Sequence, residues 1–299
     1  MKKTNLLFSG IAFLSLLLFT SCSDTSFEEE MLHTSESLPE SDNESDKVLL
    51  FGNVSEDIQF DGYYVGADTL LFDYQTISIL DVPPVYPETI TNDEPIWFVN
   101  GAGTDVAKQY KNMVEIAEFT GRPVVGIHNG TKEGIADVVE IILPTNEIVE
   151  AAIEKSVLEI IDTDIKVLLF GHSQGAYHLS RSLRSLENQL SNRQLGQLMV
   201  ETIGGAGMWF PRGPQYVHYA NKGDNVPKVH GVLTPVALPG NRSVIFEFDD
   251  EWYDIPPEVD TPFIRVHAQI VYLRNRLTFS EARTFAPLFG HKKIDLDNL

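Results

Sequence analysis

A sharp turn framed by glycines constrains this sequence more than any other feature. Gly171-His172-Ser173-Gln174-Gly175 follows the apolar run Val167–Phe170 and precedes an expected helix from about Ala176 to Leu190. A strand that turns at once into a helix leaves no room for side chains beside the turn, which explains both glycines. Ser173 is then expected at the carboxyl end of a sheet with its hydroxyl exposed. The alternative interpretation is a glycine–serine turn without chemistry.

The body of the chain alternates between expected strands and expected helices. Apolar runs typical of strands buried on both faces lie at 96–99, 124–127 and 167–170, and further strands are expected at 198–203, 215–219 and 244–248. Amphipathic helices are expected at 106–119 and 146–161. This alternation predicts an α/β fold whose mostly parallel central sheet has helices on both faces. Short β-rich runs predict a leading antiparallel portion at 48–51, 58–65 and 70–72.

Charge and cysteine content exclude several classes of function. The chain has 22 Lys and Arg against 43 Asp and Glu, a formal charge of −21, so it lacks the basic face that nucleic acid requires. A single cysteine excludes an internal disulfide and a cysteine-rich zinc site. The sequence has no H-E-x-x-H or comparable spacing of ligands. We therefore expect neither a metal nor a cofactor.

The N-terminus predicts export and a lipid anchor. Met1-Lys2-Lys3 precedes the apolar run Leu6–Phe19, which at about 14 residues is too short to span a bilayer but fits a signal peptide. The run leads to Cys22 in a segment that resembles the lipobox of bacterial lipoproteins, with Phe19 and Thr20 as departures from its usual residues. The resemblance implies a signal peptide at 1–21, acylation of Cys22 and a place in the bacterial cell envelope, at the outer membrane. The alternative is an ordinary signal peptide with an incidental cysteine.

An acidic segment separates this leader from the folded body. Residues 22–47 carry nine Asp and Glu side chains and few apolar ones, so burial cannot offset the entropy of ordering them. We interpret 22–47 as a disordered tether and 48–299 as one catalytic domain. An acidic export signal or calcium binding remains compatible with a tether.

With its strand before and helix after, the motif around Ser173 resembles the nucleophile elbow of the α/β-hydrolase superfamily, and its H-S-Q-G-A core is similar to elbows of lipases and cutinases. The resemblance covers roughly residues 94–275. It implies an α/β-hydrolase fold and a serine nucleophile at Ser173.

A second match is Phe98-Val99-Asn100-Gly101-Ala102-Gly103, which occupies the place of the family's oxyanion-hole segment. Asn100 replaces the usual histidine. The resemblance implies that the backbone amides of Ala102 and Gln174 bind the oxyanion, as two donors should. A phosphate-cradling loop is the alternative, but the spaced third glycine and the P-loop lysine are both missing.

The acid and the base follow in the family's chain order. Asn221-Lys222-Gly223-Asp224-Asn225-Val226-Pro227 resembles the acid loop of lipase-like hydrolases, which implies Asp224 as the triad acid, and His267 follows as the base. Alternatives are a β-turn with a solvated carboxylate and a histidine packed on an amphipathic segment. His218 and His230 compete as bases, and Asp254 and Asp260 compete as acids.

These features together predict a serine hydrolase that cleaves carboxylic esters, with lipid or other acyl esters favoured by the resemblance. Glycan or polyester esterase activity is the alternative within enzymes, and peptidase activity comes after it. A catalytically inactive surface binding module of the same fold is the alternative outside enzymes. The loop Gly204–Pro211 lines an acyl pocket, forms a lid or simply packs in the core; the sequence leaves these options open.

Overall fold

The computed structural model describes residues 56–130, 145–257 and 260–299. The signal peptide at 1–21, Cys22, the tether at 22–47 and the strand expected at 48–51 therefore lie outside the described residues. In the described part of the chain, no helix has the length and apolar character needed to cross a membrane.

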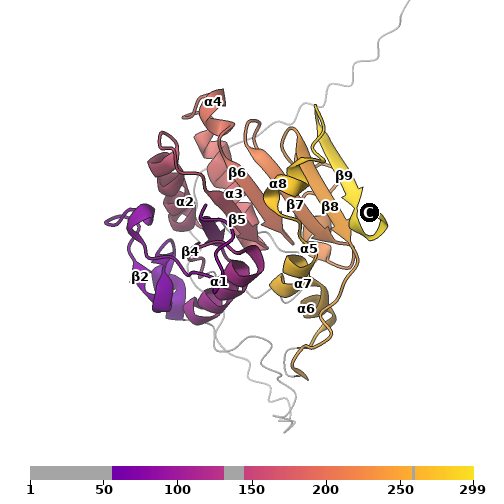
Figure 1. The fold of residues 1–299 in the computed structure, drawn as a ribbon, viewed down its shortest axis with the longest axis horizontal. Coiled ribbons are helices and arrows are strands. Elements are labelled where there is room, and N and C mark those ends of the chain that lie inside the picture. The colour runs from indigo at the N-terminus through magenta and orange to yellow at the C-terminus, as the bar shows by residue number, and fades with distance from the viewer. Residues whose placement is uncertain (1–55, 131–144, 258–259) are drawn as a thin grey trace, which may run out of the picture. The chain divides into compact units, whose positions relative to one another are not determined.

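The described residues form one nine-stranded sheet in the order β2-β1-β4-β3-β5-β6-β7-β8-β9 (Figure 1). Strand β1 pairs antiparallel with both β2 and β4, and every neighbouring pair from β4 to β9 is parallel. The strands are β1 (Tyr64–Val65), β2 (Leu71–Phe72), β3 (Ile96–Val99), β4 (Val124–Ile127), β5 (Leu168–His172), β6 (Met199–Ile203), β7 (Gln215–Asn221), β8 (Ser243–Phe248) and β9 (His291–Asp295).

Eight α-helices accompany these strands within the described ranges: α1 (Val106–Thr120), α2 (Glu147–Ile160), α3 (Gln174–Leu186), α4 (Asn192–Leu195), α5 (Asn225–Val229), α6 (Pro262–His267), α7 (Gln269–Arg274) and α8 (Phe279–Arg283). Short 3-10 helices are η1 (Glu56–Phe60), η2 (Ala67–Thr69), η3 (Ile79–Asp81) and η5 (Leu296–Asn298). Both ends of α1 are set by residues next to them in the sequence. The Asp105 side chain caps the amide of Lys108 at the start of α1, and Gly121 ends that helix in the left-handed region with φ 63°.

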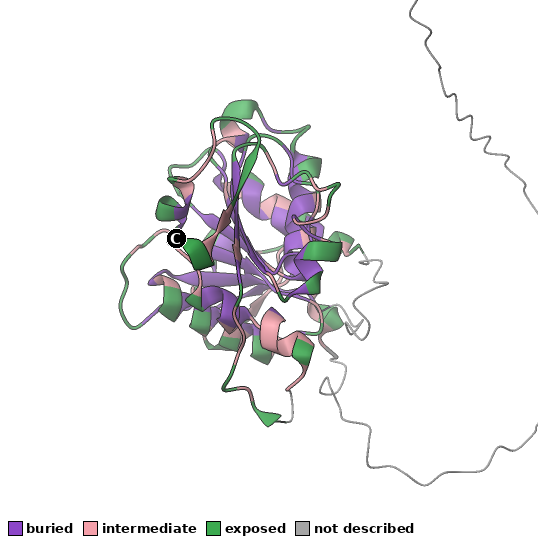
Figure 2. Cartoon of the chain, turned by 90° about the vertical axis from the view of Figure 1, so that its right-hand side faces the viewer, coloured by how far each residue is buried: buried purple, intermediate pink, exposed green. Residues whose placement is uncertain are grey.

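Two apolar clusters, one on each face of the sheet, hold the layers together. Alternate residues of β3 separate between them: Trp97 and Val99 join the cluster under α2 and α3, whereas Ile96 and Phe98 join the cluster under α1, α7 and α8. This division follows from the two-residue period of a strand. Figure 2 shows the buried strands and inner helix faces enclosed by exposed helix surfaces and loops.

The strand order confirms the predicted α/β-hydrolase fold. The chain runs from β3 to β4 on one side and then returns to β5 on the other side of β3. Ligands of open α/β sheets bind where the strand order reverses, outside the carboxyl ends of the strands. The fold therefore directs attention to the loops that follow β3 and β5.

Several boundaries differ from the sequence expectation. The helix after the serine begins at Gln174, two residues earlier than expected, and only Tyr64–Val65 of the run 58–65 forms a strand. Residues Glu56–Phe60 form a 3-10 helix instead. Strand β9 and helix α8 were not expected from the sequence.

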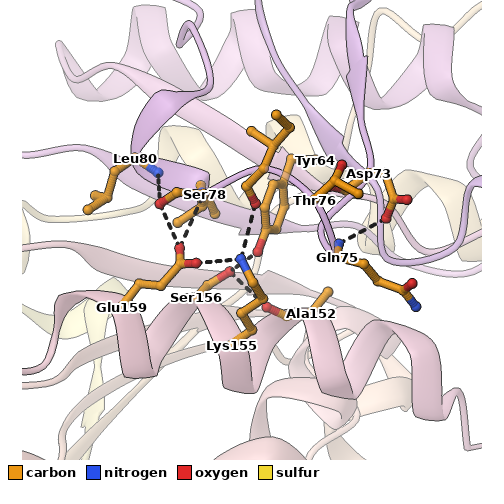
Figure 3. A network of polar contacts seen from close by, with 12 residues as sticks. Tyr64, Asp73, Gln75, Thr76, Ser78, Leu80, Ala152, Lys155, Ser156 and Glu159 are labelled. Atoms are coloured by element: carbon orange, nitrogen blue, oxygen red, sulfur yellow. Dashed lines mark hydrogen bonds and ion pairs between the residues drawn. The ribbon is translucent and has the colours of Figure 1, made fainter.

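A polar network attaches the leading antiparallel portion to α2 (Figure 3). Glu159 accepts hydrogen bonds from the Ser78 hydroxyl at 2.9 Å and from the Ile79 amide at 3.1 Å. The Ser156 hydroxyl lies 3.0 Å from the Tyr64 hydroxyl, and burial raises the pKa of Tyr64, so its phenol stays protonated. These contacts join β1 and η3 to a helix about 80 residues further along the chain.

Candidate active site

The turn between β5 and α3 places Ser173 in a strained conformation. Ser173 has φ 53° and ψ −123°, a region that residues with a side chain seldom adopt. Neighbouring backbone makes both glycines necessary. A Cβ on Gly171 would lie 2.8 Å from the Ala176 Cα, and one on Gly175 would lie 2.1 Å from the Val99 oxygen. The tight turn aims the Ser173 hydroxyl out of the carboxyl edge of the sheet.

Three side chains from distant parts of the chain meet at this turn. The Ser173 Oγ lies 2.9 Å from the His267 Nε2, and the His267 Nδ1 lies 2.6 Å from the Asp224 Oδ2. With a neutral imidazole, Nδ1–H donates to the carboxylate and Nε2 accepts from the serine hydroxyl. All three residues are buried, with exposed fractions of 3% for Ser173, 5% for His267 and 0% for Asp224. The sequence expectation of an exposed serine hydroxyl was therefore wrong, because the neighbouring loops and the His267 ring cover it. The arrangement can take a proton from Ser173 and stabilise the resulting imidazolium.

The carboxylate of Asp224 is fixed from several sides. Asp224 caps α5, so its Oδ1 accepts the Val226 amide at 2.9 Å. Its Oδ2 accepts the Tyr272 hydroxyl at 2.5 Å in addition to the His267 imidazole. Burial raises the pKa of Tyr272 well above its ordinary value, and the charge of Asp224 acts in the same direction. The phenol is therefore a hydrogen-bond donor to the acid.

Asn221 connects the loop that holds Asp224 to the helix that holds His267. Its side-chain Oδ1 accepts the Gly223 amide at 2.9 Å, which shapes the turn before Asp224. Its Nδ2 donates to the backbone oxygens of Val266 at 3.2 Å and Asp250 at 2.5 Å. One amide side chain thus holds β7, the end of β8 and α6 in a common position.

The His267 imidazole lies between two other rings. The Phe263 ring, one helical turn earlier on α6, stacks on it with centroids 4.6 Å apart and an interplanar angle of 27°. The His172 ring lies on another side at 5.0 Å and 30°, and its Nε2 is 3.1 Å from the His267 backbone oxygen. Burial lowers the pKa of His172 to about 3, and the neighbouring His267 acts in the same direction, so His172 is a neutral donor at this contact.

The loop after β3 approaches the serine closely. A Cβ on Gly101 would lie 2.8 Å from the Ser173 Cβ, so this position has no room for a side chain. Among the residues that the structure describes, neither the Ala102 amide nor the Gln174 amide donates to a protein acceptor. Within the described residues, both amides are therefore available to an oxyanion, and their use for that purpose stays a prediction.

A buried network of amide groups includes Asn100, which occupies the position where the α/β-hydrolases that the sequence resembles usually have histidine. The Asn100 Nδ2 donates to the Asn129 oxygen at 2.7 Å, and the Asn129 amide donates back to the Asn100 Oδ1 at 2.9 Å. The Asn129 Nδ2 then reaches the Gln174 Oε1 at 2.9 Å. Asn100 thus links the ends of β3 and β4, and Asn129 links them in turn to the first residue of α3.

The competing histidine and acids lie outside this arrangement. His218 is buried in β7, with Nδ1 2.8 Å from the Thr202 Oγ1 and Nε2 2.9 Å from the Pro239 oxygen. Burial lowers the pKa of His218 to about 4, as expected for a neutral histidine in the core. Asp260 pairs with Arg265, and Asp254 is exposed.

The loop Gly204–Pro211 supports the elbow and contributes to the core. The Ala206 amide donates to the Ser173 oxygen at 3.0 Å, and the Phe210 ring packs on Tyr216 in the core. Trp209 is 45% exposed and lies under the Arg184 guanidinium, on the surface.

His230, the remaining histidine that competes with His267 as a base, is half-buried, and burial lowers its pKa.

Sequence reasoning missed four residues at this site. Tyr272 and Asn129 lie outside every motif, and Asn221 and His172 lie inside the motifs of Asp224 and Ser173 without an assigned role. Each of the four acts through contacts between segments distant in sequence. The one available signal was the place of Asn221 and His172 within those motifs. Within the described ranges, no cluster of three or more His, Cys, Asp or Glu side chains could hold a metal ion.

No protein-family model matches the sequence, and no curated protein matches it. Among solved structures, the chain is similar to an esterase of Pyrobaculum calidifontis, with 11% identity, a TM-score of 0.36 and coverage of 56% of this chain and 69% of that one. The chain is also similar to esterase B of Lactobacillus rhamnosis, with 12% identity, a TM-score of 0.37 and coverage of 67% of this chain and 79% of that one. A third similar structure is XC6422 of Xanthomonas campestris, described as an a/b serine hydrolase without lid. It has 15% identity and a TM-score of 0.33, with coverage of 67% of this chain and 82% of that one. Likenesses this distant carry no argument about residues or substrate.

Proposed function

We propose that this chain is a serine hydrolase that cleaves carboxylic esters through an acyl-enzyme. The observation that carries the proposal is the hydrogen-bonded series Ser173–His267–Asp224, assembled at the strained turn after β5. A nucleophile, a base and an orienting acid in this geometry are the parts that acyl transfer needs. Residues of a binding module would have no physical reason to keep this alignment.

In the first half of the reaction, the Ser173 Oγ attacks the ester carbonyl while the His267 Nε2 accepts the hydroxyl proton. The negative charge that develops on the carbonyl oxygen is stabilised by the backbone amides of Ala102 and Gln174. Asp224 stabilises the imidazolium. His267 then donates the proton to the leaving alcohol as the carbon–oxygen bond of the ester breaks, which leaves Ser173 acylated.

In the second half, His267 takes a proton from a water molecule that attacks the acyl-enzyme. The same two amides stabilise the second tetrahedral intermediate. Its collapse returns the proton from His267 to the Ser173 Oγ and releases a carboxylic acid. The cycle consumes one ester and one water, and needs no cofactor.

Lipid or other acyl esters are the proposed substrates. The support is the lipase-like sequence of the elbow and acid loop, together with an apolar ring, Phe263, that lies half-buried against the catalytic imidazole. Glycan and polyester esters remain the alternative substrate class. A series of p-nitrophenyl esters of increasing chain length, compared with p-nitroanilides of the same acyl groups, separates these classes and tests for peptidase chemistry.

Substitution of the serine tests the proposed function. Ser173→Ala should abolish ester hydrolysis, because no other group replaces the nucleophile. Ser180→Ala is the matched control: Ser180 is also buried on α3, but its hydroxyl donates to the Tyr177 backbone oxygen. Activity should vanish in the first variant and persist in the second. Hydrolysis at the unsubstituted rate by Ser173→Ala would refute the proposal.

We propose a lipid anchor at Cys22 that holds the enzyme at the bacterial outer membrane. The basic start, the short apolar run and the cysteine after it support this placement. More than one acyl chain is needed for stable anchoring, which the lipoprotein pathway would supply. Cys22→Ser should move the protein from the membrane fraction to the soluble fraction, and a chain that begins at Lys47 should retain its turnover of short esters.

A further inference from the structure

We propose that Tyr272 is a positioning residue that shares the charge of Asp224 and thereby sets the pH range in which His267 acts as a base. The inference rests on the proposed function and deepens it. Its starting point is that one carboxylate oxygen, the Asp224 Oδ2, accepts two hydrogen bonds, from the Tyr272 hydroxyl at 2.5 Å and from His267 at 2.6 Å. The two donors compete for the same negative charge.

The Tyr272 ring is held so that its hydroxyl has little freedom to turn elsewhere. It is fully buried on α7 and packs edge-on against Phe248 of β8, with ring centroids 5.3 Å apart and an angle of 80°. Gly204 leaves space for the ring, since a Cβ there would lie 3.1 Å from the Tyr272 hydroxyl and ring carbons. The backbone amide of Asn221 donates to the same hydroxyl at 3.3 Å.

The hydrogen bond from the Asn221 backbone amide polarises the Tyr272 hydroxyl and favours the hydrogen bond that this hydroxyl donates to Asp224. A phenol that receives one hydrogen bond is a better donor of another. Burial and the adjacent carboxylate keep the phenol protonated, as its raised pKa indicates. Asn221, Tyr272 and Asp224 therefore form a short series that ends on the catalytic acid.

The surroundings leave Tyr272 as the main neutral group that acts on this acid. Within the described residues, the titratable side chains seen in contact with the Asp224–His267 pair are Tyr272 from α7 and His172 from β5, and His172 is held neutral by its lowered pKa. Lys108 of α1 acts on His172 from further away. Asp250 pairs with Arg274 at 2.9 Å, so it adds little net charge.

A carboxylate that accepts no hydrogen bond from a phenol keeps more of its negative charge, and it therefore stabilises an imidazolium more strongly. Removing the Tyr272 hydroxyl should therefore make His267 protonate at higher pH, and the protonated imidazole cannot accept the serine proton. In Tyr272→Phe, the acid limb of the kcat/KM profile should move upward by about half a pH unit or more. The value of kcat on the plateau should fall less than about tenfold, because Val226 still orients the acid.

Tyr216→Phe is the matched control. Tyr216 is equally buried, and its hydroxyl donates to the Pro211 oxygen at 3.0 Å, in the core rather than at the acid. Tyr216→Phe loses one buried hydrogen bond and Tyr272→Phe loses two, so both variants should unfold at lower urea concentration. The shift of the acid limb should appear in Tyr272→Phe alone. An unchanged limb, or one that moves to lower pH, overturns the proposal.

A readout without substrate separates this inference from the proposed function. The proton on the His267 Nδ1, in its short bond to Asp224, can be followed by downfield proton NMR of the full chain across pH. Its transition should move upward in Tyr272→Phe and stay in place in Tyr216→Phe. If it shifts while no ester is turned over, the proposed function fails and the positioning role stands. If esters are turned over but the transition does not shift, the proposed function stands and the positioning role fails.

Discussion

The proposed nucleophile and the proposed base of this molecule are held in place by different means. Ser173 lies in a turn whose geometry comes from adjacent residues, since Gly171 and Gly175 leave space for the backbone around it. His267 lies on a six-residue helix, α6, that is attached by single contacts such as the Asn221 bond to Val266. The elbow is thus encoded locally, whereas the position of the base depends on several bonds between distant segments. Substitutions should affect the two regions in different ways.

The largest expected effect comes from removal of the proposed base, His267. His267→Ala should lower kcat by about 10⁴-fold or more, since Ser173 then has no proton acceptor. His230→Ala is the matched control, because His230 follows the acid loop but is not part of the hydrogen-bonded series. Ester hydrolysis by the two purified variants checks this prediction. Loss in His230→Ala with near-normal turnover in His267→Ala would reassign the base.

The next effect tests the local encoding of the elbow. In Gly175→Ala the added Cβ would lie 2.1 Å from the Val99 oxygen, so the turn must shift. We expect a loss of about 1–3 kcal/mol in the free energy of unfolding and a drop in kcat of about a hundredfold. Gly196→Ala should have a much smaller effect on both, since its Cβ would lie 3.3 Å from the Asn192 oxygen, a contact that a shift of a few tenths of an ångström relieves. Urea unfolding and ester turnover measure both quantities, and equal behaviour of the variants would contradict the local account.

A smaller effect should follow from loosening the base. Asn221→Ala removes the side-chain bonds to Gly223, Val266 and Asp250 but substitutes none of Ser173, His267 and Asp224. We expect kcat to fall about ten- to a hundredfold with KM nearly unchanged, because misplacement affects the proton transfer more than binding. Steady-state kinetics at saturating ester give the two values. A change in KM alone would show that Asn221 shapes the binding site instead.

The smallest effect concerns stability and pH. Burial lowers the pKa of His218 to about 4 in the native protein, against about 6.5 for an ordinary histidine. The native state resists protonation here and the unfolded state does not, so this contribution is complete above pH 6.5 and is lost as pH falls toward 4. Between pH 7 and pH 5 it should cost about 2 kcal/mol. Urea unfolding of His218→Gln should show a smaller loss over this interval; an equal loss would refute the assignment.

The same contrast explains how much of the molecule could be predicted from its sequence. The strands around Ile96–Val99 and Leu168–His172 and the turn at Ser173 were predictable, because apolar runs and glycines specify them locally. The mostly parallel sheet followed from the alternation of strands and helices, and the structure brings Asp224 and His267 to Ser173.

The contacts that fix the base could not be predicted in this way. Tyr272 is an aromatic residue in an apolar segment, and nothing local separates a core tyrosine from one that binds an acid 48 residues away. Strand β9 was missed for a similar reason. Its His291-Lys292-Lys293 start is polar because it lies exposed at the sheet edge, and lysine is common on edge strands.

The central claim is that Ser173 is a nucleophile activated by His267. Its most direct test is to treat the full chain with a fluorophosphonate and locate the adduct by mass spectrometry of the digested protein. The account predicts one adduct per molecule, on the Ser173 Oγ, formed rapidly by the unsubstituted protein and very slowly by His267→Ala. No adduct at all, or an adduct on another serine, would contradict it.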